Sequence, residues 1–159
     1  MRRASKVPLL GLLSLLGIAL AGCGGAPPPP TVAAVTVTAS ADANPDASGQ
    51  GAPVAVRIYQ LASTANFDKA DFFQLYQHEQ ETLGADLLGR DEVLVTPGGT
   101  QQVQKELKPG ASFIGVVVAF RDIQKATWRG SVAPPPNKTT PIQVTIQGLN
   151  ATVALAGGS

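Results

Sequence analysis

Residues 113–120, FIGVVVAF, form a nearly continuous run of apolar side chains and decide the fold class of this chain. A strand with one face in water alternates apolar and polar residues, because successive side chains point to opposite faces of the sheet. A strand that is covered on both faces carries apolar residues at nearly every position. The run therefore predicts a central strand with both faces covered.

The stretches before and after this run predict further strands. Within residues 31–40, Val35 and Val37 fall on one face of a strand, and Thr36 and Thr38 fall on the other. Short turns rich in glycine and proline separate the stretches. The other expected strands span residues 53–61, 92–95, 101–107, 142–146 and 149–155. This order predicts a mainly β chain, folded as an antiparallel β-sandwich of about seven to eight strands.

Residues 68–83 change the period from that of a strand to that of a helix. Phe72, Leu75 and Tyr76 recur at intervals of three and four residues, which places them on one helix face. Asp68 is the expected N-cap, and the glycine directly after residue 83 is expected to end the helix. Because the helix is apolar on one side only, we expect it to pack on a sheet or to cover a sheet edge.

The most loop-like stretch lies between the first two expected strands, at residues 41–51. It has no large apolar residue and is rich in Asp, Asn, Pro, Ser and Gly, which favour turns. Loops of this length are usually functional or mobile. Asp42, Asn44, Asp46 and Ser48 alternate like calcium ligands, but the glycine and the final glutamate of an EF-hand loop are missing. The residues alone leave three interpretations: a mobile polar loop, a partner-binding loop or a calcium site.

The only cysteine, Cys23, follows a segment with the features of a bacterial signal peptide. Three basic residues precede an apolar run over residues 8–20, which is too short to span a bilayer as a helix. The sequence LAGC at residues 20–23 then resembles the lipobox of bacterial lipoproteins. This resemblance implies that residues 1–22 are a cleaved signal peptide. It also implies that Cys23 is lipidated, with a diacylglycerol on its thiol and an acyl chain on its new amine. No other cofactor is expected.

The residues after Cys23 suggest where the protein resides. In well-studied Gram-negative bacteria an Asp directly after the lipidated cysteine signals retention in the inner membrane. This chain has Gly24 at that position, which favours the outer membrane, with the protein facing the periplasm. Residues 23–31 are expected to form the lipidated cysteine and a proline-rich tether, extended at about 3.1 Å per residue. Residues 32–159 are expected to form the β-sandwich domain.

The charge of the mature chain excludes some classes of partner. Cleavage after residue 22 removes three basic residues and leaves 9 basic against 11 acidic ones, a net charge near −2. There is no basic patch that would indicate nucleic-acid binding. No apolar run after Cys23 approaches the length of a membrane-spanning helix.

Three segments of the chain resemble the TssJ family (also called SciN or VasD), the outer-membrane lipoproteins of the type VI secretion system. The segments are VRIYQLASTANFDKADFFQLY at 56–76, LGADLLGRDEVLVTPG at 83–98 and VVVAFRDIQKATWRG at 116–130. The resemblance runs from Val54 to Leu155 and implies a transthyretin-like β-sandwich with one inserted helical element. It also implies that the protein is not an enzyme.

The resemblance further implies a protein partner. In this family the lipoprotein anchors a TssJ–TssL–TssM membrane complex by binding the periplasmic C-terminal region of the inner-membrane protein TssM. The loop between the first two strands has a main role in that contact. The corresponding residues here are Asp42, Ala43, Asn44, Pro45, Asp46, Ala47, Ser48, Gly49 and Gln50. No small-molecule substrate and no metal is expected.

The residues that could support catalysis have simpler explanations. The sole histidine, His78, is expected to be solvated on the polar side of the helix. Glu79, Glu81 and Asp86 could form an acid–base pair, but we expect them to form a solvated helix face. No nucleophile elbow, zinc-protease motif or phosphate-binding loop is present in the sequence.

A second cluster follows the apolar run, with Arg121, Asp122, Trp128 and Arg129. Arg and Trp are common interface anchors, but we favour a structural role, with the tryptophan packed on the sandwich edge beside an Arg–Asp pair. Two other functions stay open. One is a periplasm-facing lipoprotein that binds a small hydrophobic ligand between its sheets or acts as an envelope sensor. The other, a periplasmic hydrolase, lacks a nucleophile–base set.

Overall fold

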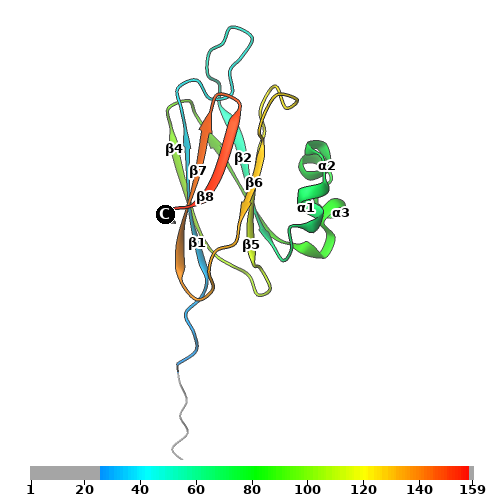
Figure 1. Cartoon of the computed structure of the whole chain (residues 1–159), viewed down its shortest axis with the longest axis vertical. Helices are drawn as coiled ribbons and strands as arrows, with labels where there is room; N and C mark the ends of the chain where they lie inside the picture. Colours follow the sequence, from blue (N-terminus) through cyan, green and yellow to red (C-terminus); the bar gives the residue numbers. More distant parts are fainter. Residues whose placement is uncertain (1–25, 158–159) are drawn as a thin grey trace, which may run out of the picture.

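The computed structural model describes residues 26–157, which form a sandwich of two four-stranded sheets (Figure 1). The first sheet has the strand order β4-β1-β7-β8, and the second has the order β3-β2-β5-β6. The strands are β1 (Val32–Ala39), β2 (Val54–Leu61), β3 (Leu87–Val95), β4 (Thr100–Glu106), β5 (Phe113–Val118), β6 (Arg129–Val132), β7 (Thr139–Gln147) and β8 (Asn150–Leu155). The mainly β sandwich is confirmed. The expected signal peptide, residues 1–22, and Cys23 lie outside the described residues.

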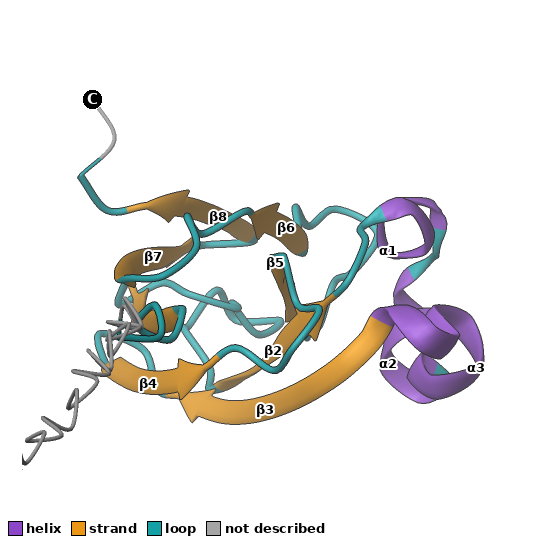
Figure 2. Cartoon of the chain, turned by 90° about the horizontal axis from the view of Figure 1, so that it is seen from below, coloured by secondary structure: helices purple, strands orange, loops and turns teal. Residues whose placement is uncertain are grey.

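Strand β5 has the central position that its apolar sequence predicts. Ile114, Val116 and Val118 are buried between the two sheets. Val117 points to the other face of the second sheet, where it is buried with residues of the helices. Figure 2 shows the helices beside the second sheet and away from the first. Both faces of β5 are therefore covered, which explains why the strand has no polar residue.

The first sheet shows the opposite pattern, with one buried and one wetter face. Strand β1 alternates between half-buried and buried residues along its whole length. Its buried side chains Val35 and Val37 share a common core with Val56 and Val116 of the second sheet. The core also contains Val54, Ile58, Val95, Ile142, Val144 and Ile146. The period-2 pattern of the sequence corresponds to this half-covered sheet.

The single helix expected over residues 68–83 is wrong, because three short helices occupy this region. They are α1 (Ala65–Lys69), α2 (Phe72–Gln77) and α3 (Glu79–Leu83), followed by the 3₁₀ turn η1 (Gly84–Asp86). Ala70 is extended, with ψ 149°, and His78 has φ −128° and ψ 35°, so neither residue continues a helix. We call α1–α3 the helical cap.

The N-terminus of helix α2 explains the break at Ala70. The carboxylate of Asp71 accepts from the Gln74 N–H, and the Gln74 side chain accepts from the Asp71 N–H, both at 2.9 Å. This capping box starts α2 at Phe72. Asp68, the expected N-cap, lies within α1 instead. Gly84 does end α3, with φ 53°.

Two features of the sheets differ from the sequence expectation. Strands β1 and β7 pair in parallel, whereas the other strand pairs are antiparallel. Strand β6 was not expected, because its sequence RGSV has no alternation. Its Gly130 has a packing reason: a Cβ there would lie 2.8 Å from Val153 Cγ2 of β8.

The two ends of the sandwich carry different segments of the chain. The N-terminal tether enters β1 at one end, and the β1–β2 loop projects from the other (Figure 1). The β3–β4 turn meets this loop, because Gly98 N–H donates to the Ser40 carbonyl at 3.1 Å. The β7–β8 turn also meets it, through Gly148. We call the end at which the tether enters β1 the tether end, and the end from which the β1–β2 loop projects the loop end. Among residues 26–157, the strands and helices lie within residues 32–155.

Candidate functional site

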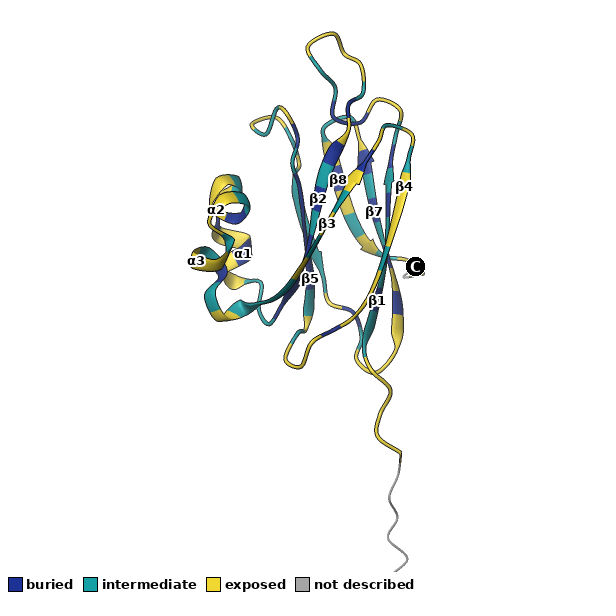
Figure 3. Ribbon diagram, turned by 180° about the vertical axis from the view of Figure 1, so that it is seen from behind, coloured by how far each residue is buried: buried dark blue, intermediate teal, exposed yellow. Residues whose placement is uncertain are grey.

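The β1–β2 loop is a narrow projection with a base and a tip. At the base, Ala52 N–H donates to the Ala43 carbonyl at 3.0 Å. Farther out, Asp46 N–H donates to the Gln50 carbonyl at 2.8 Å. We call residues 46–50 the loop tip. Figure 3 shows that the exposed residues at the end of the loop contrast with the buried strands below them. These backbone bonds give the loop a closed base and a closed tip.

Two carboxylates of the loop are held in their charged form. The carboxylate of Asp46 accepts from the Ser48 hydroxyl at 2.6 Å, the Ser48 N–H at 2.8 Å and the Gln50 N–H at 3.1 Å. These bonds, the Ser48 hydroxyl first, hold the pKa of Asp46 below its ordinary value of 3.8. The Ser40 hydroxyl donates to the carboxylate of Asp42 and lowers its pKa in the same way. The loop therefore carries two negative charges at neutral pH.

Asn44 points inward from the base of the loop. Its side chain is 2% exposed. Its Nδ2 donates to the Pro53 carbonyl at 2.9 Å, and its Oδ1 accepts from the Arg121 N–H at 2.8 Å. No local pattern in the sequence indicates a structural role for this buried amide, because one of its partners, the Arg121 N–H, lies 77 residues away.

The structure thus divides the nine residues expected to bind a partner. The exposed residues are Asp42, Ala47, Ser48, Gly49 and Gln50. Pro45 and Asp46 are half-buried, and Ala43 and Asn44 are buried. A partner can reach the exposed group without rearrangement of the loop. A hollow of about 440 Å³, lined by Ala41, Asp42, Gly49, Gln50 and Gly51, lies against this group.

The alternating residues Asp42, Asn44, Asp46 and Ser48 do not come together as a set of calcium ligands. Asn44 points into the base, and Asp46 is occupied by the N–H and hydroxyl groups of its own turn. Among residues 26–157, no three His, Cys, Asp or Glu side chains come together in an arrangement that could hold a metal ion.

The interpretation of Glu79 as part of a solvated helix face is wrong. Its side chain is only 20% exposed. Its carboxylate accepts from Arg57 at 3.3 Å, the Tyr59 hydroxyl at 3.0 Å and Arg90 at 2.9 Å. Arg57 also bonds Glu92 at 2.6 Å. This network joins α3 to the second sheet, so Glu79 serves the attachment of the helical cap.

Burial and charge act on the pKa values of this network in different ways. Burial raises the pKa of Tyr59 and keeps its hydroxyl protonated as a donor. Burial alone lowers the pKa of Arg57, but the bond to Glu92 and the neighbouring groups outweigh it and leave a raised value. Glu81 and His78 are highly exposed on the helical cap, 3.8 Å apart, as expected for solvated residues.

The cluster at residues 121–129 has the structural role that the sequence favours, although its pairing differs. Arg129 donates to the carbonyls of Phe67, Asp68 and Ala70 at 2.6 to 2.9 Å, and so holds the C-terminal end of α1. Trp128 packs edge-on against Phe72 of α2, with ring centroids 5.4 Å apart.

The expected Arg–Asp pair in this cluster is wrong. Asp122 bonds Lys125 at 2.9 Å, and the backbone of Arg121 bonds Asn44. The pairing follows from the turn that the chain makes after β5, which brings residues 122 and 125 together at a spacing of three residues.

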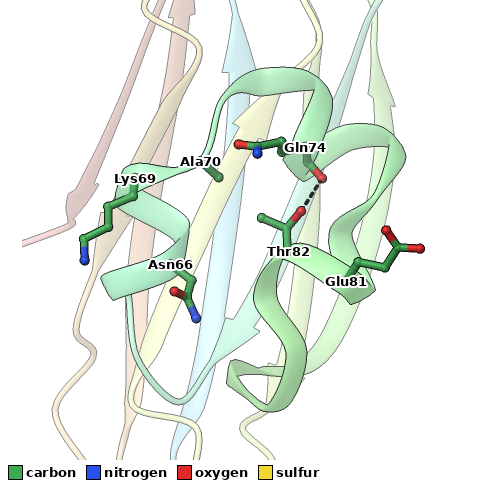
Figure 4. A pocket seen from close by; sticks show the side chains of 6 residues that line it. All are labelled: Asn66, Lys69, Ala70, Gln74, Glu81 and Thr82. Carbon is green, nitrogen blue, oxygen red and sulfur yellow. Dashed lines mark hydrogen bonds between the residues drawn. The ribbon is translucent and has the colours of Figure 1, made fainter.

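A ligand site between the sheets is not supported. The space between them is filled by core side chains that are almost fully buried. A polar hollow of about 410 Å³ lies instead on the helical cap (Figure 4), lined by Asn66, Lys69, Ala70, Gln74, Glu81 and Thr82. The Thr82 hydroxyl donates to the Gln74 carbonyl across it at 3.0 Å. This open, polar lining does not suit a small hydrophobic ligand.

Taken together, the described residues form a filled β-sandwich with a helical cap on one sheet and a hydrogen-bonded loop that projects from one end. The sequence comparison adds the family. Residues 31–149 match the family model described as type VI secretion lipoprotein, VasD, EvfM, TssJ. The chain belongs to this family of type VI secretion lipoproteins, as the resemblance predicted.

Solved structures agree with this assignment. The lipoprotein TssJ1 of Pseudomonas aeruginosa is 33% identical, with a TM-score of 0.77, over 82% of this chain and 100% of that one. The Lip protein of Serratia marcescens, described as a membrane-bound component of the type VI secretion system, is 26% identical, with a TM-score of 0.72, over 79% and 96% of the two chains.

A third match comes from a structure described as the TssM C-terminal domain (869–1107) from EAEC. It is 28% identical, with a TM-score of 0.64, over 80% of this chain and 98% of that one. A comparison with curated protein sequences finds no match. Among the described residues no helix is long and apolar enough to cross a membrane.

Proposed function

We propose that this protein is an outer-membrane lipoprotein that faces the periplasm and anchors the type VI secretion membrane complex. It does so by binding the periplasmic C-terminal region of TssM, within a TssJ–TssL–TssM complex. Its role is mechanical attachment and not catalysis. The acyl chains on Cys23 hold one end of the molecule, and the β1–β2 loop holds the partner at the other.

The observation that carries this proposal is the placement of the tether and the loop at opposite ends of the sandwich (Figure 1). Strand β1 connects them directly, and its 8 residues span about 26 Å at 3.3 Å per residue. It is hydrogen-bonded on both sides, to β4 and to β7. A pull between membrane and partner would therefore be shared by two strand pairs.

The anchor explains why a single cysteine is useful. Each buried methylene of an acyl chain contributes about 0.8 kcal/mol, and one chain alone binds a membrane only reversibly. Two or three chains on Cys23 would hold the protein on the membrane for long times. The tether of residues 23–31 then keeps the tether end close to the bilayer, with the loop end directed into the periplasm.

The third structural match supports the identity of the partner. The alignment covers 80% of this chain and 98% of the matched chain, so the matched chain is shorter than this one. It is therefore much shorter than the 869–1107 segment in its description. This favours the presence of a chain with the present fold beside the TssM domain in that structure. The exposed loop tip, with its adjoining hollow, is the surface that a partner of this kind can reach here.

Calorimetric titration of residues 24–159 with the TssM C-terminal region from the same bacterium tests the partner. We expect the parent domain to bind. We expect a tip variant, with residues 46–50 replaced by Gly-Gly-Ser-Gly-Gly, to bind about tenfold more weakly or not at all, because interface energy is concentrated in a few contacts. The tip has no buried large side chain, so the variant should stay folded, with a melting temperature only slightly below that of the parent.

The matched control changes the opposite end of the sandwich. Residues Pro136, Asn137 and Lys138 are exposed at the tether end, and their replacement by Gly-Ser-Gly should leave binding unchanged. Absence of binding by the folded parent would refute the partner. Equal loss in the tip variant and the control would refute the assignment to the loop end.

A cellular experiment tests the anchor. Replacement of the lipidated residue, Cys23→Ser, should leave the domain folded, move it from the outer-membrane fraction to the soluble periplasmic fraction, and abolish secretion. The tip variant should instead remain in the outer-membrane fraction. Normal secretion with a non-lipidated Cys23→Ser protein would contradict the anchoring function.

A further inference from the structure

Asn44 is held in a conformation that few side chains adopt. Its φ is 53°, in the left-handed region, where Asn is better tolerated than other residues with a Cβ. Its side chain is also one of three polar side chains that are buried in the described part of the chain. A buried amide at a left-handed position in a projecting loop requires a reason, because both features are costly unless hydrogen bonds compensate them.

The hydrogen bonds of Asn44 reach three separate segments of the loop end. Its backbone N–H donates to the Gly148 carbonyl of the β7–β8 turn at 2.8 Å. Its Nδ2 donates to the Pro53 carbonyl, where the loop returns to β2, at 2.9 Å. Its Oδ1 accepts from the Arg121 N–H, in the β5–β6 connection, at 2.8 Å. The residue therefore joins the base of the loop to both sheets of the sandwich.

The loop tip has no other attachment of this kind. The carboxylate of Asp46 bonds only Ser48 and Gln50, which lie within the tip itself. The cross-loop bond between Ala43 and Ala52 closes the base but does not fix its direction relative to the neighbouring connections. The β3–β4 turn also bonds the start of the loop, through Gly98 and Ser40. Within the loop, Asn44 is the residue whose side chain fixes the base to the β5–β6 connection of the second sheet.

We propose that Asn44 is a positioning residue, which fixes the β1–β2 loop in its projecting orientation before the partner arrives. The inference rests on the proposed function and assigns a role within the same site. A loop ordered in advance loses less conformational entropy on binding. If only a fraction of molecules has the loop in place, the apparent affinity falls by that fraction. Asn44 does this without touching the partner, because its side chain is buried.

The variant Asn44→Gly tests this role, since glycine adopts positive φ without strain and only the side-chain bonds are lost. With the TssM C-terminal region as the probe, surface plasmon resonance should show about tenfold slower association and an unchanged dissociation rate. Hydrogen exchange of the free domain should become faster at the Arg121 amide and at the loop tip. Exchange at the Val116 amide in the core should not change.

The matched control is Asn137→Gly. Asn137 is the other non-glycine residue with positive φ in the described chain, at 62°. It lies at the tether end, where its N–H donates to the Thr31 hydroxyl at 2.8 Å. This variant should bind like the parent. If Asn44→Gly does not fold, Asn44→Asp, which keeps the oxygen that accepts from Arg121, is measured in the same way and should also associate more slowly.

The outcomes distinguish a failure of the positioning role of Asn44 from a failure of the proposed function. Unchanged association of the Asn44 variants, or unchanged exchange at Arg121 and the tip, overturns the positioning role while parent binding upholds the proposed function. A faster dissociation with normal association also overturns it, because it indicates direct contact with the partner. Absence of binding by the parent itself overturns the proposed function, and the binding role of Asn44 with it.

Discussion

The helical cap and the β1–β2 loop are both additions to the same sandwich, but different interactions hold them. The helical cap is attached by buried side chains: Tyr59, Phe67, Leu75 and Leu83 are almost fully buried in a second core. The loop has no large apolar residue and is held by backbone hydrogen bonds and one buried amide. One addition covers a sheet face, and the other leaves its tip exposed.

This difference indicates a division of labour. Burial of a large apolar side chain contributes about 1.5–3 kcal/mol. The helical cap therefore stabilises the second sheet, whose apolar outer face would otherwise be exposed to water. A short exposed tip contributes little to stability and is available for contact. We therefore assign stability to the helical cap and propose partner binding for the loop, and the predictions below separate the two.

The largest expected effect is the loss of stability in Phe67→Ala. Phe67 is fully buried in the second core and contacts the ring of Tyr59 edge-on, with centroids 6.2 Å apart. Truncation of such a side chain costs about 3–5 kcal/mol of unfolding free energy. Urea unfolding, followed by the fluorescence of the single tryptophan, Trp128, measures the loss.

A neighbouring phenylalanine provides the control. Phe73 of α2 is 56% exposed, and Phe73→Ala should change the unfolding free energy by less than about 1 kcal/mol. Both variants, while folded, should bind the TssM region like the parent. Equal costs for the two substitutions would contradict the burial account of the helical cap.

A smaller loss of stability is expected for Arg129→Ala. The guanidinium donates three hydrogen bonds to carbonyls at the end of α1, and bonds from a charged donor contribute about 1.5–3 kcal/mol each at most. Because the site is partly exposed and water can replace the donor, we expect a total cost of about 2 kcal/mol. The same urea experiment applies.

The matched variant for this site is Arg129→Lys. Lysine keeps the charge but lacks the planar fork that reaches several carbonyls at once. It should recover only part of the lost stability. Full recovery would mean that the charge alone, and not the three directed bonds, holds α1 in place.

The smallest expected effect is a local pH response of the loop tip. The folded-state pKa of Asp46 lies below its ordinary value of 3.8. Its stabilising contribution is therefore present above about 3.8 and is lost as the pH falls through the lower folded value. NMR should show the Ser48 and Gln50 amide signals shifting in this acidic range.

The control for the pH response is Asp46→Asn, which removes the titrating group and should abolish the shift. The helical cap serves as an internal reference, since its attachment does not involve Asp46. A simultaneous shift of the α2 amides with the same midpoint would show that the tip and the helical cap are not independent.

The sequence predicted the elements whose patterns arise from burial by a neighbouring layer. The alternation of β1 and the continuous apolar run of β5 both follow directly from how many of their faces are covered. The apolar stripe of residues 72–76 correctly indicated a helical element on the sheet. Its division into short helices depends on the capping box at Asp71, which the apolar spacing does not contain. It also depends on the irregular backbone of His78, which the apolar spacing crosses to reach Leu83.

Other features depend on contacts that no local pattern contains. The parallel pairing of β1 with β7 depends on the order of strands in the sheet. The roles of Glu79 and Asn44 depend on partners far along the chain, such as Arg57 and the Arg121 backbone. Local patterns alone therefore predict that such polar residues are solvated. The position of the loop was predictable, whereas its buried base was not.

Hydrogen exchange of the domain, with and without the TssM C-terminal region, tests the division of labour most directly. The account predicts that binding slows exchange at the loop tip, residues 46–50, and leaves the amides of α2 around Phe73 unchanged. Slower exchange at α2 with no change at the loop tip would contradict the account. It would then assign binding to the helical cap.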